Sequence, residues 1–295
     1  MIVEKGRTKL RFETVTGLLA QDDPQTDDKT FDFIKSDFGL LKSSWADFRH
    51  HVDNLIKDQG DHTRYKVLYL ARHGQGYHNL AEEEYGKKLW DDVLSKQYGN
   101  DKYTWGPDPE LTEKGINQAK ENNKAWKEQK SKGVVLPVVF YTSPFTRALD
   151  TMRYTWDDIL FDTDGSGSSI KPPLVVEDLR EDNGVHTCDM RRTKSFIETR
   201  FPRVVVEKGF TEQDELWDKD HRETRAEHNQ RTLRFLNHLF ELDWDSEEPE
   251  IYVSVTSHSG TINSFLDCIG HRGFSVQTGG MIPVVVKATR VTNKQ

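Results

Sequence analysis

Five continuous apolar runs, rich in β-branched residues, are the feature that most restricts how this chain can fold. They occupy residues 66–71, 136–142, 173–178, 251–257 and 282–288. An apolar run without alternation is typical of a strand covered on both faces of its sheet. Helical patterns separate the runs, at 111–129, 146–156, 226–242 and 261–269. Alternating strands and helices favour an α/β fold, a three-layer sandwich with a mainly parallel, doubly wound sheet at its centre.

One more helix is expected before the first run. Trp45 and Phe48 begin a pattern of apolar residues at helical spacing within residues 43–57. We therefore expect residues 1–63 to form an N-terminal extension packed on a core domain of residues 64–295. The glycine- and serine-rich stretch at 162–169 is expected to be a loop.

Composition narrows the class of protein. The formal net charge is −8 and no block of Lys and Arg occurs, which argues against a nucleic-acid partner. No apolar stretch is long enough for a membrane span, so no membrane is expected either. With only Cys188 and Cys268, disulfides do not organise the fold, and a reducing compartment, the cytoplasm or the nucleus, is expected. Nothing in the chain indicates an oligomeric state.

Side chains suited to phosphate chemistry follow four of the five runs. Arg72 and His73 follow the first run, Arg147 the second, Glu181 the third and His258 the fourth. Ligands of open α/β sheets bind at the carboxyl ends of the strands, so these side chains are expected to converge. Arginine matches phosphate oxygens, an imidazole nitrogen can attack phosphorus, and a carboxylic acid can protonate the leaving oxygen. The set therefore predicts phosphoryl transfer.

The same segments resemble a known family. RHGQGYHN (72–79) is similar to the RHG-x-x-x-x-N signature of the histidine phosphatase superfamily, in the branch that contains phosphoglycerate mutases. The segments PELTEKGINQA, SPFTRALDT, DLREDNG and VTSHSGTI resemble further family segments, in order over about residues 65–265. With its VHTCDMRR continuation, the chain most resembles the fungal and plant phosphoglycerate mutase-like proteins of the yeast phosphomutase type.

The resemblance implies a role for each of the five strand-end residues. His73 would be the phosphorylated nucleophile, and Arg72, Arg147 and His258 would form the phosphate pocket. Glu181 would donate the proton to the leaving group and later activate water.

Three further residues are candidates for binding the substrate or its phosphate. Asn79 would contact one or the other, and capping a turn is the alternative. Ser259 stands where many relatives have glycine and would add a donor or narrow the pocket. His186 would line the substrate side of the pocket, unless its segment is a surface turn.

No metal or other cofactor is expected. His186 and Cys188 fit no strong zinc spacing, and phosphohistidine chemistry needs no metal. The charged stretch at 207–225 reads as a solvated surface loop, with an insertion near the substrate entrance as the alternative.

The motifs leave three functions open. A phosphohydrolase of a small phosphorylated metabolite, working through a phosphohistidine, is expected first. A phosphomutase would use the same residues, although RHGQGYHN departs from the RHGQSxWN of glycolytic mutases. A non-catalytic phosphate-binding regulator ranks last, because the nucleophile and all three phosphate-pocket residues are present: His73, Arg72, Arg147 and His258.

Overall fold

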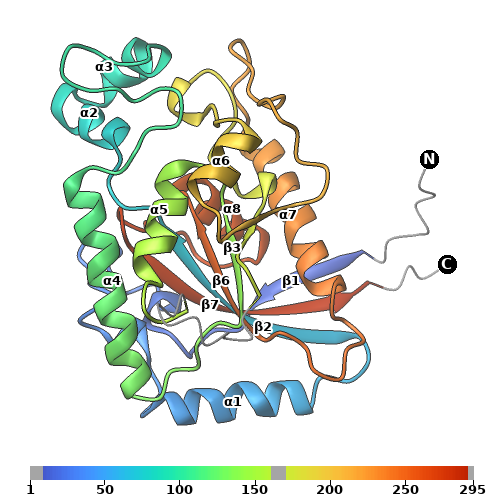
Figure 1. Ribbon diagram of the computed structural model, residues 1–295. Coiled ribbons are helices and arrows are strands. Elements are labelled where there is room, and N and C mark those ends of the chain that lie inside the picture. The colour runs from blue at the N-terminus through green and yellow to red at the C-terminus, as the bar shows by residue number, and fades with distance from the viewer. Residues whose placement is uncertain (1–8, 161–170, 292–295) are drawn as a thin grey trace, which may run out of the picture.

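The computed structural model describes residues 9–160 and 171–291, so the loop expected at 162–169 lies outside the described residues. A seven-stranded sheet forms the centre of this part of the chain (Figure 1), in the order β1-β7-β2-β6-β3-β4-β5. The strands are β1 (Leu10–Thr14), β2 (Thr63–Arg72), β3 (Val139–Thr142), β4 (Leu174–Val175), β5 (Val205–Val206), β6 (Tyr252–Ser257) and β7 (Met281–Arg290).

The sheet is mostly parallel, which confirms the predicted fold class. β2 runs parallel to β6, and β6, β3, β4 and β5 continue in parallel. β7 is antiparallel to both β2 and β1, so that edge of the sheet is antiparallel. β1 was not predicted, because only Leu10 and Phe12 of this short edge strand are buried.

Helices cover both faces of the sheet (Figure 1). Val67 and Tyr69 of β2 pack in one cluster with aromatic residues of α1 and α4, whereas Leu68 and Leu70 pack in a second cluster with α7 and α8. This alternation along one strand produces the three predicted layers. The α-helices are α1 (Trp45–Lys57), α2 (Tyr77–Tyr85), α3 (Lys87–Asp92), α4 (Glu113–Ser131), α5 (Thr146–Thr155), α6 (Lys194–Arg200), α7 (Arg225–Glu241) and α8 (Ser259–Cys268).

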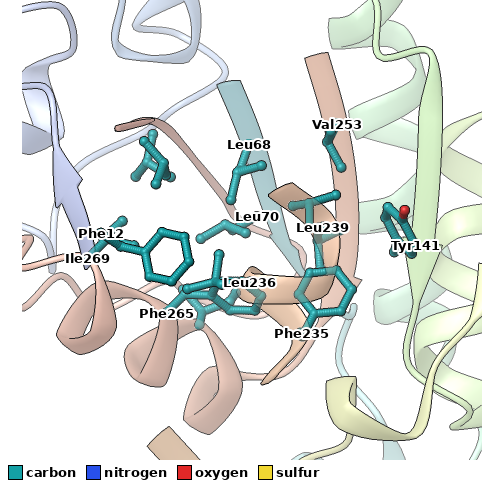
Figure 2. Close-up of a cluster of buried hydrophobic side chains, with 14 of the residues drawn as sticks. Phe12, Leu68, Leu70, Tyr141, Phe235, Leu236, Leu239, Val253, Phe265 and Ile269 are labelled. Atoms are coloured by element: carbon teal, nitrogen blue, oxygen red, sulfur yellow. The ribbon is translucent and has the colours of Figure 1, made fainter. Parts of the chain in front are cut away.

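The α7–α8 side of the core is shown in Figure 2. Leu68 and Leu70 lie on the sheet, and Phe235, Leu236 and Phe265 cover them from the two helices. Helix α7 begins at a capping box in which the Thr224 hydroxyl accepts from the Glu227 backbone amide. None of the described helices is both apolar enough and long enough to cross a bilayer.

Two predicted strands are shorter in the structure. The run at 136–142 is a strand only from Val139, because Val138 is exposed and follows a proline. The run at 173–178 is a strand only at Leu174–Val175 and then becomes a 3-10 turn at Glu177–Leu179. That turn delivers the chain to Glu181 soon after the sheet ends.

Candidate active site

The predicted site residues gather where the parallel strands end. A cavity of about 260 Å³ lies there, between the ends of β2 and β6, the turn after β4, and helices α2 and α3. Residues that sequence analysis assigned to the site make up part of its lining: Arg72, His73, Asn79, Glu181, His186 and Ser259.

His73 is buried directly after β2, in one defined tautomer. Its Nδ1 lies 2.7 Å from the carbonyl oxygen of Gly74. Because a carbonyl oxygen only accepts, Nδ1 carries the proton and donates, which leaves the lone pair on Nε2. Burial, followed by the charges of Arg147 and Arg72, holds the pKa of His73 well below its usual range. The ring is therefore neutral at physiological pH, as a nucleophile must be.

The loop after His73 is fixed by close backbone packing. A Cβ on Gly74 would lie 2.4 Å from the carbonyl oxygen of Gly115, and one on Gly115 would lie 2.2 Å from that of Gln75. The glycines let the start of α4 press against the loop. The Thr151 hydroxyl accepts from the Gly74 amide as well. Little freedom remains for the His73 backbone.

His258 follows β6 and faces His73, with 5.0 Å between the ring centroids. Its Nε2 lies 2.7 Å from the Ser143 hydroxyl, whereas its Nδ1 is buried without a protein partner. Burial and the charge of Arg147 keep the pKa of His258 well below its usual range. His258 is fully buried and is not among the residues that line the cavity, so its contact with phosphate through the unpaired Nδ1 stays a prediction.

The two predicted arginines occupy different depths. Arg72 lines the cavity, and its Nη1 donates to the carbonyl oxygen of Val276 over 2.9 Å. Arg147 is fully buried, and its guanidinium donates to the carbonyl oxygen of Cys188 and to Asp189. Its charge lowers the pKa values of both His73 and His258. Arg147 therefore acts on both rings, and its direct contact with phosphate stays a prediction.

Glu181 and Asp182 have different environments although they are adjacent. The Glu181 carboxylate accepts from the backbone amides of Gly260 and Asp182, and burial followed by the charges of Asp182 and Asp189 raises its pKa. Burial alone would raise the pKa of Asp182 too, but the hydrogen bond from His228 and the nearby cations lower it overall. Glu181 is the carboxyl group better suited to carry a proton.

The less specific predictions receive mixed answers. Asn79 lines the cavity, but its Oδ1 accepts from the Gly76 amide, so it caps the start of α2 as the alternative had it. Ser259 is the first residue of α8 and lines the cavity. His186 also lines the cavity, and its ring is edge-on to that of Trp90, with 6.4 Å between the ring centroids. Contact of these three residues with substrate is still untested.

His78 and Arg222 are among the lining residues that sequence reasoning did not assign to the site. The His78 ring lies 5.4 Å from that of His73. Its signal was its place within RHGQGYHN, on the first turn of the helix after the nucleophile. Arg222 comes from the charged 207–225 stretch and donates to Asp189 and to the carbonyl oxygens of Asp182 and Gly184. Most of the 207–225 stretch is exposed, as expected of a solvated surface loop, whereas Arg222 lines the cavity, in line with the alternative of an insertion near the substrate entrance.

Two groups of side chains bring potential metal ligands within 4.8 Å of one another in the described residues: His186 with Cys188 and Asp189, and Glu181 with Asp182 and His228. In the first, Asp189 already accepts from two arginines, and burial keeps the pKa of the Cys188 thiol well above its usual range. In the second, Asp182 is bonded to His228 at 2.6 Å. Neither arrangement offers a full set of free, deprotonated ligands, and the metal-free site stays a prediction.

Comparison with known proteins places this geometry in a family. The model of the histidine phosphatase superfamily (branch 1) matches residues 68–276. A "Probable phosphoglycerate mutase" of Arthroderma benhamiae is 40% identical over 301 residues, covering 96% of this chain and 86% of the relative. A "Phosphomutase-like protein 3" of Candida albicans is 35% identical over 281 residues, covering 94% of this chain and 80% of the relative.

A "Probable phosphoglycerate mutase" of Saccharomyces cerevisiae is 36% identical over 258 residues, covering 83% of this chain and 84% of the relative. Among solved structures, the ecdysone phosphate phosphatase of Bombix mori in complex with tungstate matches with a TM-score of 0.47 and 16% sequence identity. The match covers 74% of this chain and 88% of that protein. That likeness is too distant to inform on substrate. The family model and the fungal relatives agree: the chain is an enzyme of the histidine phosphatase superfamily, in the phosphoglycerate mutase-like branch.

Proposed function

We propose that the protein is a phosphohydrolase that removes phosphate from a small phosphorylated metabolite through a phosphohistidine on His73. One observation carries the proposal. The Nδ1–H of His73 is held by the carbonyl oxygen of Gly74, so the nucleophilic lone pair is on Nε2, in a cavity that Arg72 and Glu181 also line.

The residues support a two-step reaction. Nε2 of His73 bonds to phosphorus while the bond from phosphorus to the leaving oxygen breaks, and the proton of Glu181 moves to that oxygen. Arg72 and His258 offer donors to the phosphoryl oxygens. In the second step the Glu181 carboxylate takes a proton from water, whose oxygen bonds to phosphorus as the P–N bond breaks. His73 and Glu181 end in their starting states.

The direct test uses p-nitrophenyl phosphate with wild type and His73→Ala. We expect release of phosphate by wild type only, and labelled substrate should leave an acid-labile, base-stable adduct on His73. Label on a serine or an aspartate would contradict the mechanism. No release from folded wild type, over a panel of phosphoesters, would contradict the hydrolase proposal.

A phosphomutase is the second candidate, and the names given to the fungal relatives favour it. The two functions differ in the acceptor, since a substrate hydroxyl in place of water gives transfer. Adding a polyol acceptor to the assay and measuring the ratio of phosphate to transfer product separates them. A metabolite-phosphate screen would then identify the substrate.

We further propose a cytoplasmic or nuclear location. Both cysteines are free, as expected in a reducing compartment. Fluorescence microscopy of the tagged full chain tests this.

A further inference from the structure

His78 is a cavity-lining residue that no part of the proposed mechanism uses. It is the second residue of α2. Two hydrogen bonds fix the first turn of this helix. The Asn79 side-chain oxygen accepts from the Gly76 amide, and the Tyr77 backbone amide donates to the carbonyl oxygen of Glu110. The backbone on either side of His78 is thus fixed by hydrogen bonds. His78 therefore has a defined position relative to His73.

The hydrogen bonding of His78 is incomplete on the protein side. Its Nδ1 is buried without a partner, in a place where a Cβ on Gly76 would lie only 2.8 Å from it. Because Nδ1 packs against the backbone at Gly76, Nε2 is the ring nitrogen left for a ligand in the cavity that His78 lines.

The surroundings of His78 also determine its charge. Burial, followed by the charges of Arg147, His73 and Arg72, holds its pKa well below the usual range. The ring is neutral at physiological pH. With Nδ1 facing backbone that leaves it no acceptor, the tautomer protonated at Nε2 avoids burying an unpaired N–H. His78 then presents an N–H donor, and no positive charge, to the cavity.

Two imidazoles thus lie near the nucleophile at similar separations, His258 at 5.0 Å and His78 at 5.4 Å between ring centroids. At these separations, a phosphoryl group carried on Nε2 of His73 would be close enough for a donor on either neighbour to bind one of its oxygens. We propose that His78 is a further catalytic residue, whose Nε2–H donates to a phosphoryl oxygen during transfer to and from His73. This assignment rests on the proposed phosphohistidine function.

The test compares His78→Ala with His78→Gln, whose amide restores an N–H donor. With p-nitrophenyl phosphate, His78→Ala should lose roughly 10²-fold in kcat/KM, the usual effect of removing one preorganised donor. His78→Gln should recover most of that loss. The matched control is His50→Ala, because His50 is exposed on α1, outside the cavity.

A second readout separates a donor from a structural residue. Orthovanadate mimics the pentacoordinate transition state, so its inhibition constant should rise more in His78→Ala than that of inorganic phosphate. A residue that only supports the fold would weaken both inhibitors alike, lower the melting temperature, and show no rescue by glutamine.

The outcomes separate the two proposals. Two results would overturn the role of His78 and leave the proposed function standing. In one, the wild type is active and His78→Ala turns over substrate equally fast. In the other, His78→Ala and His78→Gln lose the same amount of activity. A wild type that neither hydrolyses p-nitrophenyl phosphate nor binds orthovanadate or phosphate would overturn both.

Discussion

At the residue scale, the neighbours of Glu181 and Asp182 drive their protonation in opposite directions. Burial, followed by the charges of Asp182 and Asp189, raises the pKa of Glu181, and its carboxylate accepts from the backbone amides of Asp182 and Gly260. Asp182 is bonded to His228 and lies 3.7 Å from Arg222, and its pKa is lowered. Sequence order alone could not decide between two adjacent carboxyl groups, because each has the same chemistry until its partners are known.

The first prediction concerns pH and Glu181→Gln. The acid form of Glu181 is active in the first step, so kcat/KM for an alkyl phosphate should fall as pH rises through the raised pKa of Glu181. On the acid side, activity should persist until pH reaches the lowered pKa of His73, below which the nucleophile is protonated. Glu181→Gln should slow this substrate by roughly 10²–10⁴-fold and should abolish the alkaline limb.

The substrate provides the control. p-Nitrophenyl phosphate has a leaving group that needs no proton, so Glu181→Gln should affect its first step little. The titration of the substrate phosphate is common to both enzymes and cancels in the comparison. A larger loss in Asp182→Asn than in Glu181→Gln would show that the wrong carboxyl group was chosen.

At the scale of elements, the proposed acid is placed by two helices that lie far along the chain. Helix α8 supplies the Gly260 amide that donates to Glu181. Helix α7 supplies Arg231, whose guanidinium donates to the carbonyl oxygens of Arg180 and Glu181 and binds Glu223. The loop after β4 is thus fixed from outside itself, since it has little regular structure of its own.

The second prediction is Gly260→Ala. A Cβ at Gly260 would lie 2.0 Å from Oε1 of Glu181, so the carboxyl group must move. We expect a loss of kcat/KM on alkyl phosphates. The loss on p-nitrophenyl phosphate should be smaller, because its leaving group needs no proton in the first step. Steady-state kinetics with both substrates measure this.

Gly273→Ala is the matched control for that variant. A Cβ at Gly273 meets nothing within 4 Å, so activity should be unchanged on both substrates. Equal kinetics for the two alanine variants would contradict the idea that α8 positions the acid.

At the scale of the whole molecule, the layer of α7 and α8 both stabilises the sheet and supports the site. Leu236 is fully buried between the sheet and α8, in the cluster shown in Figure 2. Removing its side chain would leave a cavity that the surrounding aromatic rings fill only in part. The layer that positions the acid therefore also carries much of the hydrophobic stabilisation.

The third prediction is that Leu236→Ala lowers the free energy of unfolding by about 2–5 kcal/mol, the usual effect for a buried leucine. Urea denaturation followed by fluorescence measures it. Leu242→Ala, just after the same helix and 59% exposed, should change stability by less than about 0.5 kcal/mol. Equal losses in the two variants would contradict this assignment of the core.

Much of this protein could be read from its sequence. The uninterrupted apolar runs predicted a mainly parallel sheet covered on both faces. A strand buried on both faces has no residues that face solvent, so its sequence does not alternate with polar side chains. The residues that follow those runs predicted phosphate chemistry, since parallel strands deliver their ends to one edge. The motif order indicated the superfamily.

Tertiary structure decided what depends on partners distant in sequence. The edge strand β1 became visible only through its pairing with β7. The different environments of Glu181 and Asp182 depend on contacts from α7 and α8. The position of Arg222 depends on how the charged loop folds back, and that of His78 on its approach to His73. Periodicity reports which side of an element is buried, whereas pKa values and hydrogen bonds depend on which groups the fold brings within a few ångströms.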